Sequence, residues 1–199
     1  MSWMDGIRKG AINRVTNETE IDLVFCLDGE GAYKIDTGIP FLDHMLSLFT
    51  RHGGFDLTLK ASGDLEVDSH HTVEDLGVCL GGALKRALGD KMGINRYGSA
   101  LIPMDDALIL VALDLSGRGY LAFDAVLPLE RLGSFDSELV EEFCRALAIN
   151  GAFNLHVRML AGHNTHHIIE GIFKAMAVAL KDATARGKLS GLPSTKGLL

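Results

Sequence analysis

The pattern His-His-x-x-Glu occurs twice in this 199-residue chain, at 70–74 and at 166–170, and its surroundings are repeated with it. The segment Ala83-Leu84-Lys85 recurs as Ala179-Leu180-Lys181, and a stretch of alternating apolar and polar residues precedes each pattern, at 54–60 and 152–158. Two copies are too few for a solenoid, which needs at least about three repeats to bury a continuous core. The chain is therefore predicted to be a duplicated α+β unit.

Each half is predicted to contain a hairpin, a helix, an alternating strand and a helix that starts with the two histidines. Glycine turns indicate hairpins that pair 21–26 with 32–36 and 107–114 with 120–125, and apolar spacing indicates helices over 41–51 and 138–150. Two glycines, at 89 and 93, mark the joint, and no long linker separates the halves. A single domain over 1–199 is expected, with two repeats of about 1–92 and 93–190 sharing one core and a C-terminal surface tail.

Composition limits the class of protein. With 47% hydrophobic and 23% charged residues, the chain can bury an ordinary globular core. The formal net charge of -7 without a basic run argues against a nucleic-acid or membrane partner, so a small molecule is the expected partner.

The longest apolar run, 107–113, is too short to span a bilayer, and residues 1–10 have no hydrophobic signal segment. Cys26, Cys79 and Cys144 lie far apart in apolar runs; as reduced core thiols they indicate the cytoplasm and exclude a thiolate metal site.

The repeated motif has the ligand types of a divalent metal site. Imidazole and carboxylate bind Mn, Fe, Ni or Zn, and the glutamate of each copy lies one helical turn from both of its histidines. Consecutive helical residues point about 100° apart, so the two histidines of one pair are expected to bind different ions. Two copies therefore predict two metal ions, with histidines exchanged between the halves.

His44 is a further candidate ligand, because its imidazole interrupts an otherwise apolar helical face. The repeat aligns it with Glu142, whose carboxylate can also bind a metal. A lone histidine on an apolar face is more often a hydrogen-bonded core residue, and we interpret His52 and His156 in that way. His163 is interpreted as a loop residue without a role.

These motifs, in this order, resemble the imidazoleglycerol-phosphate dehydratase family of histidine biosynthesis over nearly the whole chain. The matching segments are Gly38–Met45, Asp68–Asp75, Gly93–Arg96, Asp114–Arg118, Asn164–Glu170 and Pro193–Gly197. The resemblance implies a manganese-dependent carbon–oxygen hydro-lyase whose two α+β halves enclose their helices between two four-stranded mixed β-sheets. It also implies a homo-oligomer of twenty-four subunits, with active sites between subunits and two Mn²⁺ per active site.

The resemblance further implies two sets of metal ligands, which need not come from one chain. The first set is His44, His71, Glu74 and His166, and the second is His70, His167, Glu170 and the residue at position 142. Some members of the family have a histidine at that position, whereas this chain has Glu142. Glutamate also binds manganese, so the second site is retained as a prediction.

The reaction that the resemblance implies is dehydration of D-erythro-imidazole-glycerol phosphate to imidazole-acetol phosphate. A metal on a ring nitrogen favours the imidazolate, which expels the neighbouring hydroxyl and leaves a diazafulvene-like intermediate with an acidic C–H. A carboxylate must move protons; Glu18 is the favoured candidate, and the ligand glutamates Glu74 and Glu170 are the others.

Several side chains match family positions that contact substrate. Cationic and hydroxyl groups suited to the phosphate are supplied by Arg96, Arg118, Ser194 and Lys196, so the tail is expected to bind substrate. The expected substrate-binding set also includes Glu18, His44, His70 and His166. Two alternatives stay open: a dinuclear metallohydrolase that acts on a small phosphate ester, and a metal that only holds an assembly together.

Overall fold

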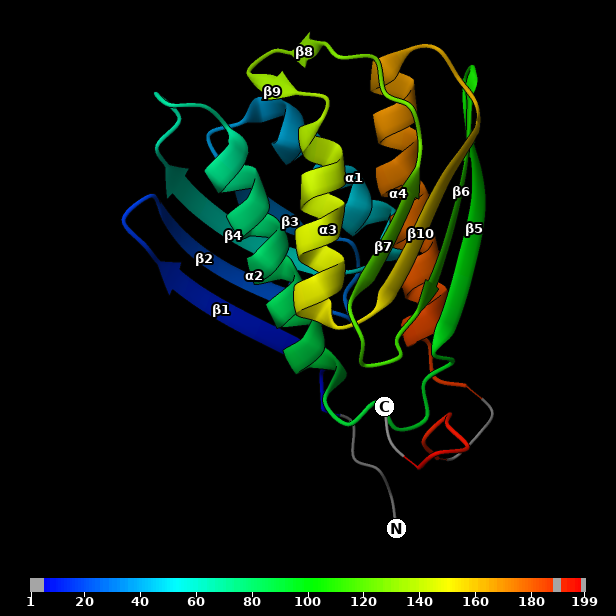
Figure 1. Ribbon diagram of the computed structural model, residues 1–199. Coiled ribbons are helices and arrows are strands. Elements are labelled where there is room, and N and C mark those ends of the chain that lie inside the picture. Colours follow the sequence, from blue (N-terminus) through cyan, green and yellow to red (C-terminus); the bar gives the residue numbers. More distant parts are fainter. Residues whose placement is uncertain (1–5, 188–190, 198–199) are drawn as a thin grey trace.

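The computed structural model describes residues 6–187 and 191–197 and consists of two halves with the same order of elements (Figure 1). The first half contains β1 (Lys9–Val15), β2 (Thr19–Cys26), β3 (Tyr33–Asp36), α1 (Pro40–Gly53), β4 (Asp56–Gly63) and α2 (His70–Leu88). The second contains β5 (Tyr97–Met104), β6 (Ala107–Asp114), β7 (Tyr120–Asp124), β8 (Arg131–Leu132), β9 (Phe135–Asp136), α3 (Leu139–Gly151), β10 (Asn154–Ala161) and α4 (Thr165–Thr184). Only the short strands β8 and β9 interrupt the correspondence, so the predicted duplicated α+β fold is confirmed.

Each half forms a four-stranded mixed sheet, with the strand orders β1-β2-β4-β3 and β5-β6-β10-β7. The antiparallel hairpins join β1 to β2 and β5 to β6, while β3 and β7 run parallel to β4 and β10. The predicted hairpins of 21–26 with 32–36 and of 107–114 with 120–125 are therefore wrong. The strand that returns after α1 or α3 takes the place between them, and it separates two strands that are neighbours in the sequence.

All four helices lie between the two sheets (Figure 1). α2 packs on β1 and β2 and beside α3, whereas α4 packs on β5 and β6 and beside α1. Each long helix thus covers the sheet of its own half and pairs with the short helix of the other half. One continuous core results, because neither half buries its helices alone.

Small residues on the edge strands let the long helices approach closely. A Cβ atom on Gly10 of β1 would lie 2.0 Å from the carbonyl oxygen of Ala83, and one on Gly98 of β5 would lie 1.9 Å from that of Ala179. Both positions therefore require glycine. The same small residues explain why β1 and β5 are not predicted from the sequence, since a strand is recognised by its large β-branched and aromatic side chains.

The short helices lie where apolar spacing predicts them, with bounds shifted by at most two residues. In α1 the buried face includes Leu42, Met45 and Phe49, at the i, i+3, i+7 spacing of one helical stripe. Pro40 occupies the first turn, where its missing N–H costs nothing, and Gly54 ends the helix in the left-handed conformation with φ 69°. The residues of α1 itself therefore determine where the helix begins and ends. The side of the helix that is not buried in the core is available for function.

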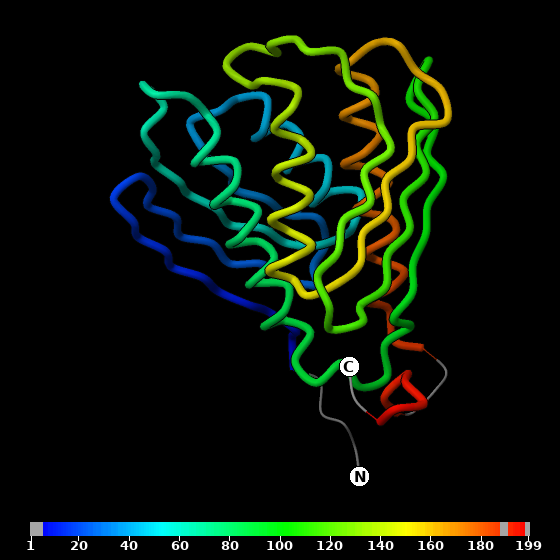
Figure 2. The backbone as a smooth tube through the Cα atoms, viewed as in Figure 1, coloured from blue at the N-terminus to red at the C-terminus, as the bar shows by residue number. Residues whose placement is uncertain are grey.

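The tail packs against the joint between the halves. Figure 2 shows residues 191–197, in red, below the end of α4 and far from β8 and β9. The N–H of Gly93 donates to the carbonyl of Gly191 at 3.0 Å, and Arg96 Nη1 donates to the carbonyl of Pro193 at 2.8 Å. These two hydrogen bonds attach the described part of the tail to the start of the second half.

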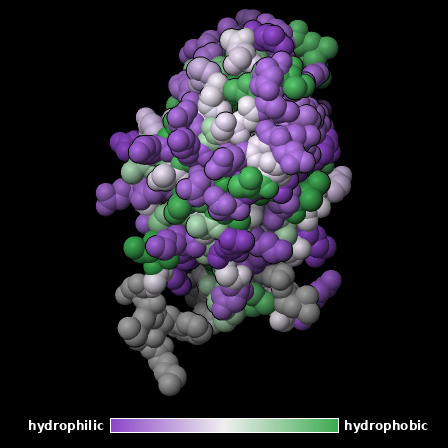
Figure 3. All heavy atoms as spheres, turned by 90° about the vertical axis from the view of Figure 1, so that its left-hand side faces the viewer, coloured by the Kyte–Doolittle hydropathy of each residue, from purple (hydrophilic) through white to green (hydrophobic). Residues whose placement is uncertain are grey.

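The outer face of the first sheet, turned toward the viewer in Figure 3, is mostly hydrophilic with separate hydrophobic spots. Its strands expose the apolar side chains of Val15, Val24 and Tyr33. Sheets with antiparallel strands commonly have one solvent-exposed face and one buried face.

Within the described residues, no helix is both long enough and apolar enough to cross a membrane.

Candidate metal centre

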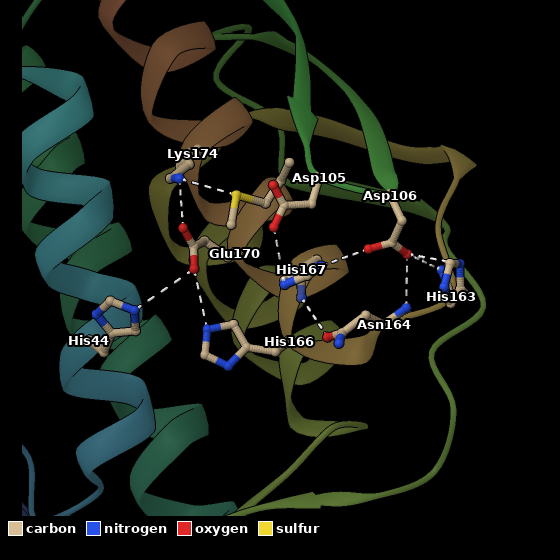
Figure 4. Close-up of polar contacts among 10 residues, drawn as sticks. His44, Asp105, Asp106, His163, Asn164, His166, His167, Glu170 and Lys174 are labelled. Carbon is tan, nitrogen blue, oxygen red and sulfur yellow. Dashed lines mark hydrogen bonds and ion pairs between the residues drawn. The ribbon is translucent and has the colours of Figure 1, made fainter.

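Both histidine pairs lie in the first turn of a long helix, His70 and His71 in α2 and His166 and His167 in α4. The ring centroids are 6.2 Å apart in each pair, and the ring planes differ by 89° and 77° respectively. The two rings of a pair therefore diverge, as the rotation of about 100° per residue predicts. Each ring meets different neighbours, which Figure 4 shows for α4.

Three metal-capable side chains converge between α1 and α4 (Figure 4). The candidate ligand atoms of His44, His166 and Glu170 all lie within 4.8 Å of one another. Glu170 Oε2 is 3.2 Å from His166 Nε2 and 3.8 Å from His44 Nε2. An ion with ligands at about 2 Å needs donor atoms roughly 3–4 Å apart, so this group fits a divalent metal.

Glu170 is the buried member of the group, with 7% of the residue exposed. Its second oxygen, Oε1, accepts a hydrogen bond from Lys174 Nζ at 2.6 Å, and the same ammonium lies 3.4 Å from the sulfur of Met104. Burial raises the pKa of Glu170, but Lys174 and the two histidines outweigh burial, and the net pKa lies below its ordinary value. Glu170 is therefore a carboxylate at neutral pH, with Oε2 directed at the two imidazoles.

His167 points away from this group, toward the turn between β5 and β6 (Figure 4). Its Nδ1 lies 2.6 Å from Asp106 Oδ1, and its Nε2 lies 3.4 Å from Asp105 Oδ2. The other oxygen of Asp106 accepts hydrogen bonds from the backbone N–H groups of His163 at 2.7 Å and Asn164 at 3.0 Å. These backbone donors and His167 hold the pKa of Asp106 well below its ordinary value, so the carboxylate stays ionised.

The first half builds a similar group around His71 with different residues. His71 Nδ1 lies 3.0 Å from Asp64 Oδ2, and its Nε2 lies 3.9 Å from Glu18 Oε1. The hydrogen bond to Asp64 raises the pKa of His71 above its ordinary value. The Glu18 side chain is 54% exposed, and it is therefore freer than the carboxylates around α4.

Within one chain, the ligands are grouped differently from the two sets that the resemblance implies. Glu170 lies beside His44 and His166, although the implied sets separate it from them. Lys174 lies one turn further along α4 and holds the carboxylate toward α1, which accounts for this position. The three side chains form one group within the folded chain.

Three other predicted ligands do not join this group. His70 and Glu74 are exposed in the first turns of α2. Glu142 lies in the first turn of α3, with Oε2 3.9 Å from Arg145 Nε. Among the described residues, no hydrogen bond or ion pair connects Glu142 to a histidine. Its predicted role as a ligand stays a prediction.

The predicted phosphate-binding residues lie at the opposite end of α4. The backbone N–H of Arg96 donates to the carbonyl of Ala183, close to the end of that helix. His166 and Ala183 are seventeen positions apart on α4, which at 1.5 Å per residue is about 25 Å. The other cationic and hydroxyl candidates belong to the loop after β6 and to the tail at this end: Arg118, Ser194 and Lys196.

Arg96 is held in place but still has donors to offer. Its Nε donates to Asp114 Oδ1 at 2.7 Å and its Nη2 to Oδ2 at 3.1 Å, which raises the pKa of Arg96. With the bond from Nη1 to Pro193, three of the five guanidinium N–H groups are used. Two remain to bind an anion.

Two hollows meet at His166. One, of about 470 Å³, is lined by Phe41, His44 and Ser134, and the other, of about 590 Å³, is lined by Asp106 and His167. Volumes of this size are typical of small-molecule sites. The histidines of α4 thus separate two spaces, each large enough for part of a small substrate.

Asp64, Asp106 and Lys174 contact the predicted ligands but are not part of the motifs. Lys174 could have been found from its i+4 spacing to Glu170. Asp106 directly precedes β6 as Glu18 precedes β2, so a repeat alignment extended to these strands would have paired the two. No sequence signal singles out Asp64, a loop residue after β4.

The interpretation of His52 and His156 as core residues is wrong, because both are exposed. His52 lies in the last turn of α1, and His156 lies on the outer side of β10. His163 is an exposed loop residue, as expected, with Nδ1 3.0 Å from Asp106.

Comparison with known proteins shows the family of the chain. The family model described as imidazoleglycerol-phosphate dehydratase matches residues 37–180. Proteins of that name from Pelotomaculum thermopropionicum and Desulforudis audaxviator are each 62% identical, over 96% and 97% of this chain and 98% of each relative.

Solved structures show the same fold. The crystal structure of imidazoleglycerol-phosphate dehydratase from Staphylococcus aureus has a TM-score of 0.81 at 42% identity, covering 89% of this chain and 99% of that one. The corresponding enzyme from Pyrococcus furiosus has a TM-score of 0.82 at 37% identity, covering 94% and 100%. The chain therefore belongs to the imidazoleglycerol-phosphate dehydratase family, the hydro-lyases of histidine biosynthesis.

Proposed function

We propose that this enzyme removes water from D-erythro-imidazole-glycerol phosphate and releases imidazole-acetol phosphate. The observation that carries the proposal is the group of His44, His166 and Glu170 at the start of a duplicated His-His helix, in a chain of this family. The hydroxyl beside the ring leaves, the neighbouring carbon loses its proton, and the resulting enol becomes the ketone. The phosphate ester is not broken.

Two Mn²⁺ ions serve each active site. His44, His166 and Glu170 suit one ion by donor type and separation, and His71 and His167 each keep Nε2 available for a metal. The remaining ligands of the two sets are His70, Glu74 and Glu142. A bound divalent ion supplies Lewis acidity, which lowers the pKa of an imidazole that it contacts.

Glu18 is the group that moves protons. Its carboxylate lies 3.9 Å from His71 Nε2, and its side chain is more than half exposed. Glu170, by contrast, has Oε1 occupied by Lys174 and Oε2 directed at two histidines. A general base needs an oxygen that is free to reach the substrate, so these contacts favour Glu18 over Glu170.

The active site is completed between subunits of a homo-oligomer, for which we propose twenty-four subunits. About 25 Å of helix separates His166 from Arg96, which is longer than a small phosphorylated imidazole. One substrate molecule therefore reaches the histidines of one chain and Arg96, with Arg118, Ser194 and Lys196, of another. Assembly is then a requirement for activity.

The cytoplasm is the proposed compartment. The three cysteines are free, and burial raises the pKa of the Cys79 and Cys144 thiols to about 11 and about 12. Such thiols are inert core groups, which suits a reducing compartment.

Product analysis tests the proposed reaction. The purified enzyme with Mn²⁺ is incubated with imidazole-glycerol phosphate, and both the ketone and inorganic phosphate are measured. We expect one phosphorylated ketone per substrate consumed and no phosphate release. Phosphate release in place of the ketone would identify a metallohydrolase instead. Full turnover after removal of metal by a chelator would contradict the catalytic role of manganese.

A further inference from the structure

The second histidine of each pair has its Nδ1 engaged by a carboxylate. Asp64 Oδ2 lies 3.0 Å from His71 Nδ1, and Asp106 Oδ1 lies 2.6 Å from His167 Nδ1 (Figure 4 shows the second). An ionised carboxylate only accepts, so in the neutral imidazole the proton sits on Nδ1. The lone pair is then on Nε2, the atom free to bind a metal.

The duplication does not explain this shared arrangement. Asp64 directly follows β4, whereas Asp106 directly precedes β6, so the two residues occupy unrelated positions in the repeat. The repeat counterpart of Asp106 is Glu18, which directly precedes β2. Glu18 lies near Nε2 of His71 rather than near Nδ1. The two halves therefore form the same hydrogen bond with residues at different positions of the repeat, which indicates that the hydrogen bond itself is needed.

The surroundings of Nε2 also favour a cation. Asp105 Oδ2 lies 3.4 Å from Nε2 of His167, and Glu18 Oε1 lies 3.9 Å from Nε2 of His71. Both carboxylates are largely exposed, at 69% and 54%, and both can adjust to an ion beside the ring. Asp106 differs from these two carboxylates because two backbone N–H groups hold it in place. Asp106 can therefore orient a ring, whereas Asp105 and Glu18 can move.

We propose that Asp64 and Asp106 are positioning residues that hold His71 and His167 in the Nδ1–H tautomer, with Nε2 presented to the metal. Because Asp64 supplies this contact in the first half, Glu18 is left free for proton transfer. The inference rests on the proposed metal sites.

The substitution Asp106→Asn tests the tautomer of His167 separately from the backbone hydrogen bonds of Asp106. Oδ2 accepts the two backbone hydrogen bonds and Oδ1 meets the imidazole, so the asparagine oxygen takes the first role and its NH₂ group faces His167. That NH₂ group donates, which moves the ring proton to Nε2. We expect Mn²⁺ affinity at one site per chain to fall about 10–100-fold, while the Tm of the metal-free protein falls only slightly, because the amide oxygen keeps the two backbone hydrogen bonds and only the charge is lost.

Asp64 offers a matched comparison. Its Oδ1 is buried and has no hydrogen-bond partner among the described residues, so Asp64→Asn can place its NH₂ group there and keep an oxygen toward His71. Asp64→Asn should therefore retain most of the affinity, whereas Asp64→Leu, of similar size but without an acceptor, should lose it. Asp124→Asn, at an exposed ion pair with Arg158, is the control.

The measurements are metal content by elemental analysis, Mn²⁺ titration of metal-stripped protein by calorimetry, and histidine tautomers by ¹⁵N solid-state NMR. Wild-type protein that binds no Mn²⁺ would refute the proposed function itself. Wild-type protein with two sites, and an Asp106→Asn variant of equal affinity or unchanged tautomer, would overturn only this inference. A drop in metal-free Tm that accounts for the lost affinity would assign Asp106 a purely structural role and would also overturn it.

Discussion

Carboxylates near the histidines differ in how firmly neighbouring residues hold them. Asp106 accepts three hydrogen bonds, and Glu170 is buried against Lys174, so both have a fixed direction. Glu18 has only a long contact to His71 and is half exposed. This difference in mobility is the reason why we propose Glu18 as the group that moves a proton.

Replacement of Glu18 tests this division. Glu18→Gln should lower kcat by about 10²–10⁴-fold, because the amide cannot take up a proton. Metal content and Tm should not change much, since the one ion pair of this side chain among the described residues is the long, exposed contact to His71. Glu20→Gln, an exposed change on neighbouring β2, is the control and should retain activity. Loss of Mn²⁺ in Glu18→Gln would show that Glu18 is a ligand instead.

The Arg8–Asp28 ion pair should make stability depend on acid. Arg8 binds both oxygens of Asp28 and holds the pKa of that carboxyl below its ordinary value. A lowered folded-state pKa adds stability that is complete above about pH 4, the ordinary value, and is lost as pH falls through the folded value. With the Asp28 side chain 38% exposed, solvent screening limits the effect to about 1 kcal/mol.

In metal-stripped protein, the wild type should therefore melt about 2–4 °C above Asp28→Asn at pH 6. The gap should close as pH falls below about 4. Thermal unfolding between pH 2.5 and 6 measures it, with Asp22→Asn on the exposed side of β2 as control. A gap that is constant over this range would mean that the charge of Asp28 does not stabilise the fold.

At the scale of elements, the separation between each long helix and its edge strand depends on one glycine. Gly98→Ala would place Cβ 1.9 Å from the carbonyl oxygen of Ala179, so α4 must move away from β5. We expect a loss of about 1–3 kcal/mol in the free energy of unfolding, as for other overpacked sites. Denaturant unfolding measures this loss, and Gly6→Ala, where no atom lies within 4 Å, is the control. If both variants had the same free energy of unfolding, α4 and β5 would be able to move apart without loss of stability.

Helices of this chain are predictable because their signals are local. Apolar spacing, Pro40 and Gly54 define α1 within its own residues, and the paired histidines mark the starts of α2 and α4. Strand partners are not local. The glycine turn before β3 suggests a hairpin, but β3 pairs with β4, which returns only after α1 has crossed the sheet.

At the scale of the whole molecule, the two groups of functional residues lie about 25 Å apart along α4. The histidines are at the N-terminal end of this helix, and Arg96 is at its C-terminal end, together with the described tail (Figure 1). If both groups act as proposed, a single chain carries the metal-binding and the phosphate-binding residues but cannot bring both to one small substrate.

Mixed assemblies test this separation. His166→Ala and Arg96→Ala should each be nearly inactive, but an oligomer that contains both should recover activity at on the order of a quarter of its sites, where the intact residues of two chains meet. The two variants carry different affinity tags, and doubly purified mixed oligomers are assayed. Activity no higher than that of either variant alone would place a complete site within one chain.

Ligand types, the duplicated unit, the helix starts and the family follow from residues that act through short-range patterns, and the sequence is sufficient for them. The neighbours of those ligands are set by packing across long separations. Asp106 reaches His167 from a turn that lies 61 residues away in the sequence. Glu170 meets His44 because α4 packs on α1 of the other half. Contacts of this kind exist only once the helices have packed on the sheets and on one another, and no periodic pattern along the chain records them.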